Sequence, residues 1–156
     1  MGEVNVSKAK SPEDIEAVHI LFVEYLKGLG TEFDNKVGCA DGHADMQNFP
    51  QNYKALFLAK LDNEPVAACG LKRVNDKDCE LVRLFCRPQG RGHNLGRKLS
   101  EAAQAYVKSE GCTRLVLSTE PVMKHAVRLY KDMGFVDIEN YADAPSACSK
   151  YMALEL

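Results

Sequence analysis

The N-terminal part of the chain has the apolar spacing of one helix, which follows a short strand at residues 5–9. Ser11 is a hydroxyl N-cap and Pro12 suits the first helical position, so the helix is expected to begin there. Apolar residues then recur on one helical face, namely Ile15, Val18, Phe22, Tyr25, Leu26 and Leu29. Gly28 and Gly30 are expected to end this helix.

Residues 31–49 have no sustained hydrophobic period. So long an irregular stretch is typical of either a functional lid or a disordered loop. Apolar strands follow at 55–61 and 65–74, and the turn residues 62–63 between them predict a hairpin. A further strand is expected at 79–87.

The second half of the chain alternates helices with strands. Apolar residues share one face of a helix that begins near Leu95 and ends at Gly111, and of a second helix between Pro121 and Gly134. The remaining strands are expected at 113–118, 135–138 and 150–156. This order predicts an α+β fold in which the first of these helices connects two parallel strands.

Composition limits the classes that need to be considered. The length of 156 residues fits one domain, expected to span 1–156, and the net charge of −2 gives no general attraction for nucleic acid or anionic membranes. No apolar run is long enough to cross a bilayer. Six cysteines without a C-x-x-C pair, in a chain whose first residues form no apolar signal core, predict reduced, buried thiols in a cytoplasmic protein. Cys39 and His43 supply only half of a zinc site, so no metal is expected.

The residues that carry candidate chemistry are concentrated at 87–99, between a strand and a helix. Glycines at this place let backbone N–H groups converge on an anion, and the helix N-terminus adds partial positive charge. The dinucleotide fingerprint G-x-G-x-x-G fails because Gly90 and Gly92 would require glycine at Leu95, and the G-x-x-x-x-G-K-[ST] loop is absent as well. The segment therefore predicts a phosphate or pyrophosphate site, with a tight turn carrying solvated basic residues as the alternative.

Two motifs give this segment a family resemblance. The strand from Glu80 to Pro88, followed by Arg91-Gly92-His93-Asn94-Leu95-Gly96, resembles the R-G-x-G-x-G core of the GNAT superfamily of N-acetyltransferases. The stretch 126–135 is similar to that family's A-x-x-L-Y-x-x-x-G-F signature. The resemblance implies an acyl-CoA N-acyltransferase fold: a mixed central sheet of about seven strands, helices on both faces and a β-α-β crossover that binds CoA. Asn94 departs from the pattern, where the family has glycine, but asparagine tolerates left-handed backbone.

The resemblance also implies a set of cofactor-binding residues for acetyl-CoA as cosubstrate. Backbone N–H groups of the glycine-rich turn are expected to bind the pyrophosphate, and the preceding strand is expected to pair with the pantetheine arm as though it were another strand. A backbone N–H at Phe85 or Cys86 is expected to stabilise the oxyanion. The complete set is Leu84, Phe85, Cys86, Arg91, Gly92, His93, Asn94, Leu95, Gly96, Arg97 and Met123.

Two side chains are candidates for proton transfer. The resemblance implies that Tyr130 protonates the departing thiolate; the alternative is a core aromatic. Glu80 is a candidate base for the attacking ammonium, and the alternative is a solvent-facing strand residue paired with Arg83 or Arg73. An acetyl-Cys86 intermediate is disfavoured, since no His/Asp pair is placed to activate the thiol.

The sequence therefore predicts an enzyme that transfers an acetyl group from acetyl-CoA to a primary amine of a small molecule or peptide by direct attack. The alternative is a non-catalytic acyl-CoA-binding sensor or interaction domain of the same fold. Acceptor recognition is assigned to the acidic stretch 31–49 and to 140–143, although both also fit ordinary solvated loops. A homodimer is an option because many relatives pair through terminal strands.

Overall fold

The computed structural model describes residues 2–32, 46–141 and 150–156. Their helices and strands, in chain order, are β1 (Val4–Lys8), α1 (Pro12–Glu32), β2 (Ala55–Leu61), β3 (Glu64–Arg73), β4 (Asp78–Cys86), the short 3-10 helix η2 (Pro88–Gly90), α3 (Leu95–Ser109), β5 (Arg114–Thr119), α4 (Lys124–Asp132), β6 (Val136–Ile138) and β7 (Lys150–Glu155). The order of helices and strands is the one predicted from the sequence.

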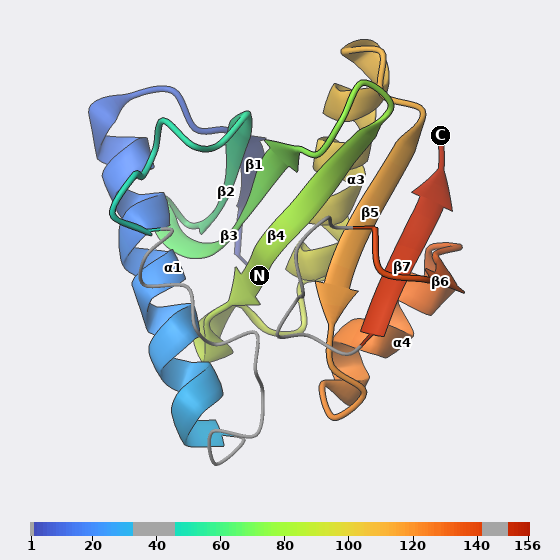
Figure 1. The fold of residues 1–156 in the computed structure, drawn as a ribbon. Helices are drawn as coiled ribbons and strands as arrows, with labels where there is room; N and C mark the ends of the chain where they lie inside the picture. Colours follow the sequence, from blue (N-terminus) through green and yellow to red (C-terminus); the bar gives the residue numbers. More distant parts are fainter. Residues whose placement is uncertain (1, 33–45, 142–149) are drawn as a thin grey trace.

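All seven of these strands join one sheet in the order β1-β2-β3-β4-β5-β7-β6. The β4–β5 pair is parallel and every other neighbouring pair is antiparallel. Helix α1 covers one face of the sheet, and α3 and α4 cover the other (Figure 1). The predicted mixed sheet with helices on both faces, and the parallel crossover through α3, are therefore confirmed.

The core has one cluster on each face of the sheet. Under α1, the predicted helical face supplies the fully buried side chains of Val18 and Phe22, and Leu21, which was not predicted, is fully buried beside them. Against α3 and α4, the larger cluster includes Leu95, Leu99, Leu115, Tyr130 and Met152. The apolar periodicity therefore identified the buried faces correctly.

The turn between β2 and β3 takes the backbone conformation that its sequence favours. Asp62 has φ 51° and Asn63 has φ 68°. Two successive residues with positive φ are the mark of a type I′ hairpin turn, which Asn and Asp tolerate better than most residues. The predicted hairpin is confirmed.

The predicted end of α1 was wrong. The helix continues through Gly28 and Gly30 to Glu32. A side chain at Gly28 would meet nothing within 4 Å, so no close approach requires glycine there. A helical glycine costs only about 1 kcal/mol relative to alanine, which the packing of the preceding apolar face outweighs.

The predicted start of α4 was also wrong. Pro121 and Val122 lie in a turn closed by the hydrogen bond from Met123 N to Glu120 O at 3.0 Å, and the helix begins at Lys124. Val122 is 45% exposed rather than part of the buried face. Proline fits an early turn as well as a first helical position, so local preference alone did not distinguish the two.

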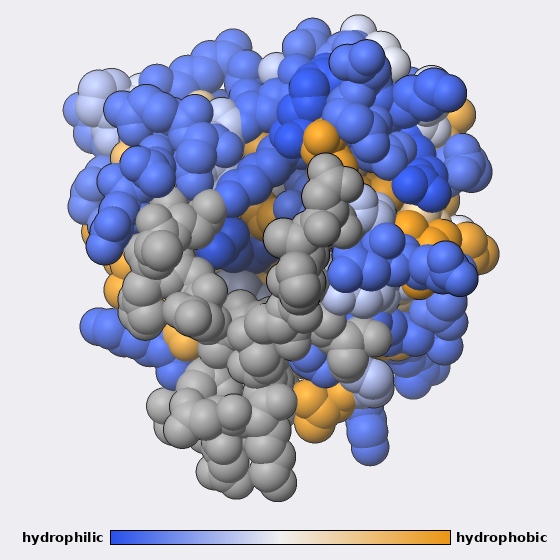
Figure 2. Space-filling view, in the orientation of Figure 1, coloured by the Kyte–Doolittle hydropathy of each residue, from blue (hydrophilic) through white to orange (hydrophobic). Residues whose placement is uncertain are grey.

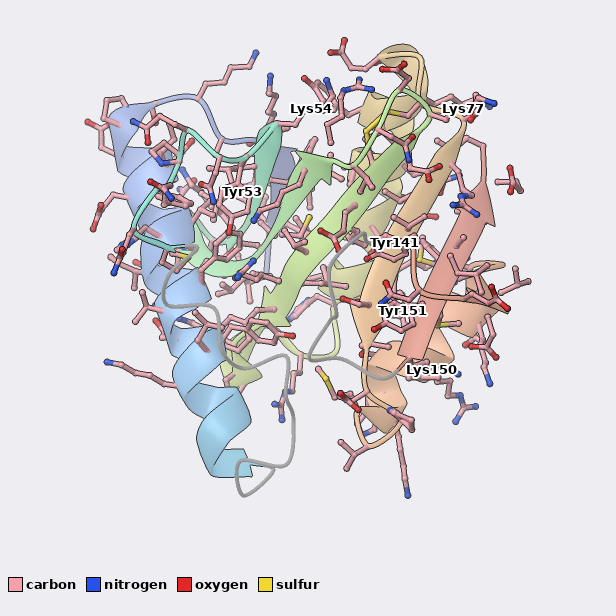
Figure 3. The ribbon with its side chains drawn as sticks, in the orientation of Figure 1. Tyr53, Lys54, Lys77, Tyr141, Lys150 and Tyr151 are labelled. Carbon is pink, nitrogen blue, oxygen red and sulfur yellow. A yellow bond between two sulfur atoms is a disulfide. The ribbon has the colours of Figure 1, made fainter. Side chains whose placement is uncertain are left out.

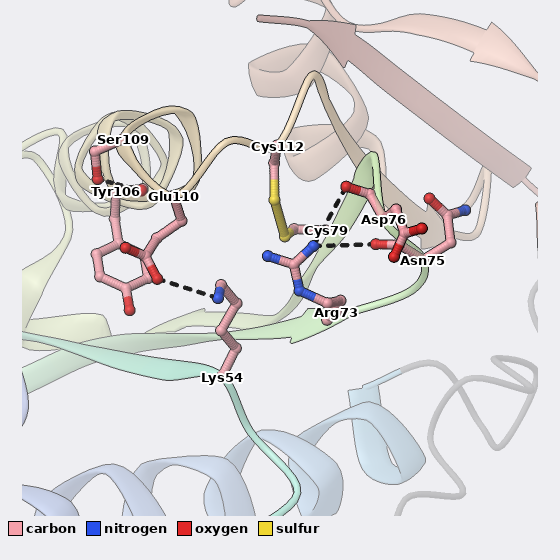
Figure 4. Close-up of polar contacts among 9 residues, drawn as sticks. All are labelled: Lys54, Arg73, Asn75, Asp76, Cys79, Tyr106, Ser109, Glu110 and Cys112. Carbon is pink, nitrogen blue, oxygen red and sulfur yellow. Dashed lines mark hydrogen bonds and ion pairs between the residues drawn. A yellow bond between two sulfur atoms is a disulfide. The ribbon is translucent and has the colours of Figure 1, made fainter.

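The cysteine prediction was wrong for one pair. Cys79, at the start of β4, forms a disulfide with Cys112, directly before β5 (Figure 4). The two cysteines are 33 positions apart in the sequence and form no spacing motif; the parallel pairing of β4 with β5 brings them together. Cys69 and Cys86 have free thiols. The two other cysteines lie outside the described residues.

The same end of the β4–β5 pair is held by an ion pair. Arg114 donates to both carboxylate oxygens of Asp78, from Nε at 3.0 Å and from Nη2 at 2.9 Å. Asn75 Nδ2 adds a third hydrogen bond to Asp78 at 3.2 Å. Asp78 and Arg114 are also opposite each other in the strand register. The ion pair therefore fastens the parallel strands where they first meet.

We expect Asp78→Asn to lower the free energy of unfolding by about 2 kcal/mol near neutral pH. The hydrogen bonds from Arg114 hold the pKa of Asp78 below its usual range, although burial opposes them. A carboxyl group whose pKa is lower in the folded than in the unfolded protein stabilises the fold at pH values above its unfolded pKa of about 3.9. This stabilisation is lost as the pH falls through the pKa of the folded state. Urea titrations at neutral and acid pH should therefore show the difference between variant and wild type shrinking in acid.

Asp137→Asn is the matched control for this experiment. Asp137 also pairs with a cation, Lys150 at 2.6 Å, but its side chain is 59% exposed. Such a surface pair contributes little to stability. A difference for Asp78→Asn that stays constant with pH would contradict the proposed role of the ion pair.

Candidate active site

The sheet opens beside the glycine-rich turn. Strands β4 and β5 are paired only from Asp78–Arg114 to Glu80–Val116 within the described chain. Beyond this point β4 stays paired with β3 as far as Cys86, and β5 stays paired with β7 as far as Thr119. The two strands therefore part, and the β5-side main chain of the second half of β4 is left for another partner. An extended ligand with amide groups can bind such an edge as a strand would.

A bulge lies in β4 at the point of divergence. Arg83 has φ 53°, and the register with β3 shifts between Ala68 and Gly70. Val82 and Phe85 then face the α1 side, whereas Leu84 packs against the cluster on the α3 side. Bulges bend a strand and change the direction of its side chains, which is common beside active sites.

The turn before α3 forms with Asn94 in place of the expected glycine. Gly92 has φ 87°, and Asn94 takes left-handed backbone with φ 56° and ψ 33° directly before the helix. The predicted tolerance of Asn94 is therefore confirmed. Of the predicted residues, Arg91, Gly92, Asn94 and Arg97 are exposed, His93 and Gly96 are half-buried, and Leu95 is buried. Leu95 can therefore serve a ligand only through its main chain.

The remaining predicted cofactor residues surround the open edge. The ring of Phe85 packs on Tyr25 with centroids 5.8 Å apart. Cys86 Sγ lies 3.4 Å from the carbonyl oxygen of Arg87, and burial raises the pKa of this thiol. Met123 caps α4, with its sulfur 3.6 Å from Thr119 Oγ1. These side chains come from β4, α1 and the start of α4, on both sides of the gap.

Tyr130 lies on α4 and belongs to the core cluster on that face of the sheet. It is 7% exposed and its ring packs against Phe135, with centroids 5.5 Å apart. Burial raises its pKa strongly, and the groups of Tyr25 and Cys69 raise it further. Tyr25 belongs to α1, on the opposite face of the sheet from α4 (Figure 1). The phenol therefore stays protonated, which suits a proton donor as well as a core aromatic.

Glu80 occupies the last parallel pair of β4 with β5. Its Oε2 accepts a hydrogen bond from the hydroxyl of Tyr141, a contact that the sequence analysis missed. Arg73, one of its two expected partners, instead donates to the carbonyls of Asn75 and Asp76 (Figure 4). No local pattern signals the contact with Tyr141, since the two residues are 61 positions apart.

Comparisons with known proteins identify the family to which this chain belongs. The model of the acetyltransferase (GNAT) family matches residues 21–135. The chain belongs to the GNAT family. An uncharacterized N-acetyltransferase of Schizosaccharomyces pombe is 29% identical over 157 residues, covering 98% of this chain and 95% of its own length.

Solved GNAT structures share the whole fold. An acetyltransferase from Streptococcus agalactiae superposes with a TM-score of 0.79 at 21% identity, over 98% of each chain. The PaiA N-acetyltransferase from Thermoplasma acidophilum, solved in complex with coenzyme A, has a TM-score of 0.71 at 18% identity over 99% of each chain. The chain therefore has the GNAT acyl-CoA N-acyltransferase fold, and the predicted fold class is confirmed. Its assignment to one domain over 1–156 stays a prediction.

The residues present fit the CoA that the GNAT fold implies. Positive φ at Gly92 and Asn94 turns the chain so that α3 begins next to the open edge of β4. The first turn of α3 contains no acidic residue, so nothing there opposes the favourable effect of the helix N-terminus on a phosphate. Arg91 and Arg97 add exposed positive charge at this end. Family membership supports use of an acyl-CoA.

A substitution at Asn94 tests this turn. We expect Asn94→Val to weaken CoA binding roughly tenfold, because left-handed backbone costs about 1–2 kcal/mol for such a residue. Asn94→Gly should bind CoA within about twofold of wild type, since Asn94 already has the left-handed conformation and its side chain makes no capping hydrogen bond. Isothermal titration calorimetry with CoA measures both. Much tighter binding by Asn94→Gly would show that the asparagine side chain obstructs the pyrophosphate.

A second missed contact joins α1 to the end of β4 in this GNAT fold. Arg87 donates from Nε to Glu24 Oε1 at 2.8 Å and from Nη2 to Oε2, and its Nη1 donates to the carbonyl of Pro65 at 3.0 Å. The hydrogen bonds with Arg87 lower the pKa of Glu24. The two residues are 63 positions apart, so their pairing follows from the packing of α1 on the sheet.

The face seen in Figure 2 is mostly hydrophilic, with a hollow near its centre over the middle of the sheet. Among the described helices none is long and apolar enough to cross a membrane. Within the part of the chain that the structure describes, no three His, Cys, Asp or Glu residues form a group that could hold a metal. Most of the predicted acceptor stretch 31–49, including Cys39 and His43, and residues 142–143 of the second stretch lie outside that part.

Proposed function

We propose that this protein transfers an acetyl group from acetyl-CoA to a primary amine of a small molecule or peptide by direct attack. The observation that carries the proposal is the parting of β4 and β5 beyond Glu80 and Val116, next to the left-handed turn that starts α3. This arrangement provides an unpaired strand edge for the amides of pantetheine and a helix N-terminus for the pyrophosphate. Relatives named as N-acetyltransferases support the same reaction class.

In the proposed mechanism the amine nitrogen attacks the thioester carbonyl and forms the C–N bond. Glu80 takes the proton that the attacking ammonium loses. A backbone N–H of Phe85 or Cys86 stabilises the negative charge on the carbonyl oxygen. The C–S bond then breaks, and Tyr130 donates its proton to the departing thiolate. Starting from the ammonium, the nitrogen loses two protons in all: Glu80 passes the first to bulk water before the attack and takes the second after the C–N bond has formed. Bulk water then carries this second proton from Glu80 to Tyr130, so that one proton is released to solvent in each turnover.

Direct transfer is favoured over a covalent intermediate on Cys86. Burial raises the pKa of the Cys86 thiol, the opposite of what a nucleophilic cysteine needs. The thiol also points at the carbonyl oxygen of its own neighbour, Arg87. Cys86 is therefore proposed to contribute its main chain and the wall of the site.

The experiment that tests the proposal has two stages. Thermal denaturation with and without acetyl-CoA measures binding, since a ligand that binds only the native state raises apparent stability. Release of free CoA thiol is then followed across a panel of primary amines, from polyamines and amino acids to peptides. A thermal shift with thiol release supports the enzyme. A shift without release from any amine would support the non-catalytic acyl-CoA sensor, and no shift with acetyl-CoA or longer acyl-CoAs would overturn both.

A further inference from the structure

The feature that the proposed mechanism leaves unused is the side chain of Tyr141. It follows β6 in the chain and reaches β4, where its hydroxyl donates a hydrogen bond to Glu80 Oε2. Ser118, on β5, lies opposite Tyr151 in the strand register, and the ring of Tyr151 contacts that of Tyr141. The phenol therefore lies beside both strands at the point where they begin to part.

The ring of Tyr141 is fixed by its packing. It meets the ring of Tyr151 on β7 edge to face, with centroids 5.8 Å apart and planes at 88°. Figure 3 shows the two tyrosines side by side at the β5–β7 end of the sheet. An edge-to-face contact of this kind restricts the ring, so the hydroxyl has a defined direction toward the carboxylate.

We propose that Tyr141 is a positioning residue: the hydrogen bond that it donates holds the carboxylate of Glu80 at the opening between β4 and β5. A hydrogen bond donated to a carboxylate favours the ionised state, which is the state that a base requires. This inference rests on the proposed function, in which Glu80 accepts the amine proton. Because Oε2 accepts the hydrogen bond from Tyr141, Oε1 is the oxygen that takes the proton from the amine.

Tyr141 does not itself exchange the proton. Burial raises its pKa far above neutrality, and the neighbouring charge and hydrogen bond of Glu80 raise it further. The phenol therefore remains a donor throughout the working pH range. Its contribution is to orient Glu80 by donating a hydrogen bond to the carboxylate.

Other groups near Glu80 come from each neighbouring element. Lys72 is its register partner on β3, and the ammonium of Lys72 lies 5.0 Å from the centroid of the Tyr53 ring. Arg83 follows on the same strand, and Ser118 and Tyr151 approach through Tyr141. Removal of the Tyr141 hydroxyl leaves these groups in place, so a change in pH dependence would report the lost hydrogen bond.

The test compares Tyr141→Phe with wild type in the pH dependence of kcat/KM, using an amine that the wild type acetylates. The acid limb is expected to move about one pH unit upward, because a hydrogen bond to a charged group is lost. The plateau value at higher pH should fall less than about threefold, since the carboxylate remains. Ser118→Ala removes a hydroxyl near the phenol but leaves the hydrogen bond from Tyr141 to Glu80, so it should move the limb less than Tyr141→Phe does. Tyr106→Phe, the same chemical change on α3, is the control and should leave the profile unchanged.

The outcomes separate this inference from the proposed function. An active wild type with an unmoved acid limb in Tyr141→Phe would overturn the positioning role and leave the acetyltransferase proposal standing. Uniform loss at all pH values, with a lower melting temperature, would also overturn it in favour of a purely structural role.

A second measurement needs no turnover. In protein carrying ¹³Cζ-tyrosine, the Tyr141 resonance is assigned by its loss in Tyr141→Phe. It should change in Glu80→Gln and also as the wild type is acidified. A resonance insensitive to both changes would overturn the proposed hydrogen bond whether or not the protein is an acetyltransferase.

Discussion

Glu80→Gln is expected to lower kcat about 10²- to 10³-fold at neutral pH while changing the affinity for acetyl-CoA little. Glutamine matches glutamate in size and its amide oxygen can still accept the hydrogen bond from Tyr141, so the site keeps its shape. The amide cannot take a proton from the attacking ammonium. The loss should therefore appear in the chemical step, which single-turnover measurements with bound acetyl-CoA isolate.

The pH dependence of this variant provides a sharper test. Without a base, only amine that is already neutral in solution can attack, so the activity of Glu80→Gln should keep rising with pH toward the amine's own pKa. Glu13→Gln, at an exposed carboxylate in the first turn of α1, is the matched control and should behave as wild type. Turnover near the wild-type value, with an unchanged acid limb, would remove Glu80 from the mechanism.

The parts of this fold that could be predicted from sequence are those that depend on near neighbours. Apolar periodicity located the buried face of α1, and the turn residues Asp62 and Asn63 predicted the hairpin between β2 and β3. The glycine-rich segment predicted where α3 starts, and the polar side chain of Asn94 was compatible with the left-handed backbone found there. In each case the physical cause lies within a few residues of the effect.

The contacts that the sequence did not reveal join residues far apart in the chain. Tyr141 reaches Glu80 because it follows β6, which pairs with β7, and β7 in turn pairs with β5. Cys79 meets Cys112 because β4 and β5 run parallel. Neither fact is encoded in hydrophobic spacing. The sequence around Glu80 is the same whether a tyrosine or solvent faces its side chain. It therefore could not distinguish a candidate base from a solvent-facing strand residue.

The motif resemblance supplied what periodicity could not, namely the role assigned to Tyr130. Apolar spacing placed this residue on the buried face of α4, and the structure agrees. Burial alone, however, does not distinguish a core aromatic from a proton donor. Both require a neutral phenol in a dry site, and the raised pKa of Tyr130 describes both. The two roles are distinguished only by the activity of a variant that lacks the Tyr130 hydroxyl.

Tyr130→Phe is expected to lower kcat roughly a hundredfold with acetyl-CoA affinity nearly unchanged. Phenylalanine keeps the ring that packs against Phe135, so the fold should survive. The departing thiolate would lose its proton donor, and its charge would have to be stabilised by water. Tyr106→Phe removes a hydroxyl from α3 and is the control, with turnover expected at the wild-type level.

The raised pKa of Tyr130 makes a further distinction possible. A folded pKa above the ordinary value of about 10 means that the phenol stays protonated through the whole assay range, so Tyr130 itself should produce no alkaline fall in kcat. The Tyr130→Phe profile should therefore run parallel to that of wild type at a lower level. Wild-type turnover in Tyr130→Phe would mean that Tyr130 is a core aromatic and that solvent protonates the thiolate. An alkaline limb that vanishes in the variant would mean that Tyr130 titrates in the assay range, against the effect of its burial.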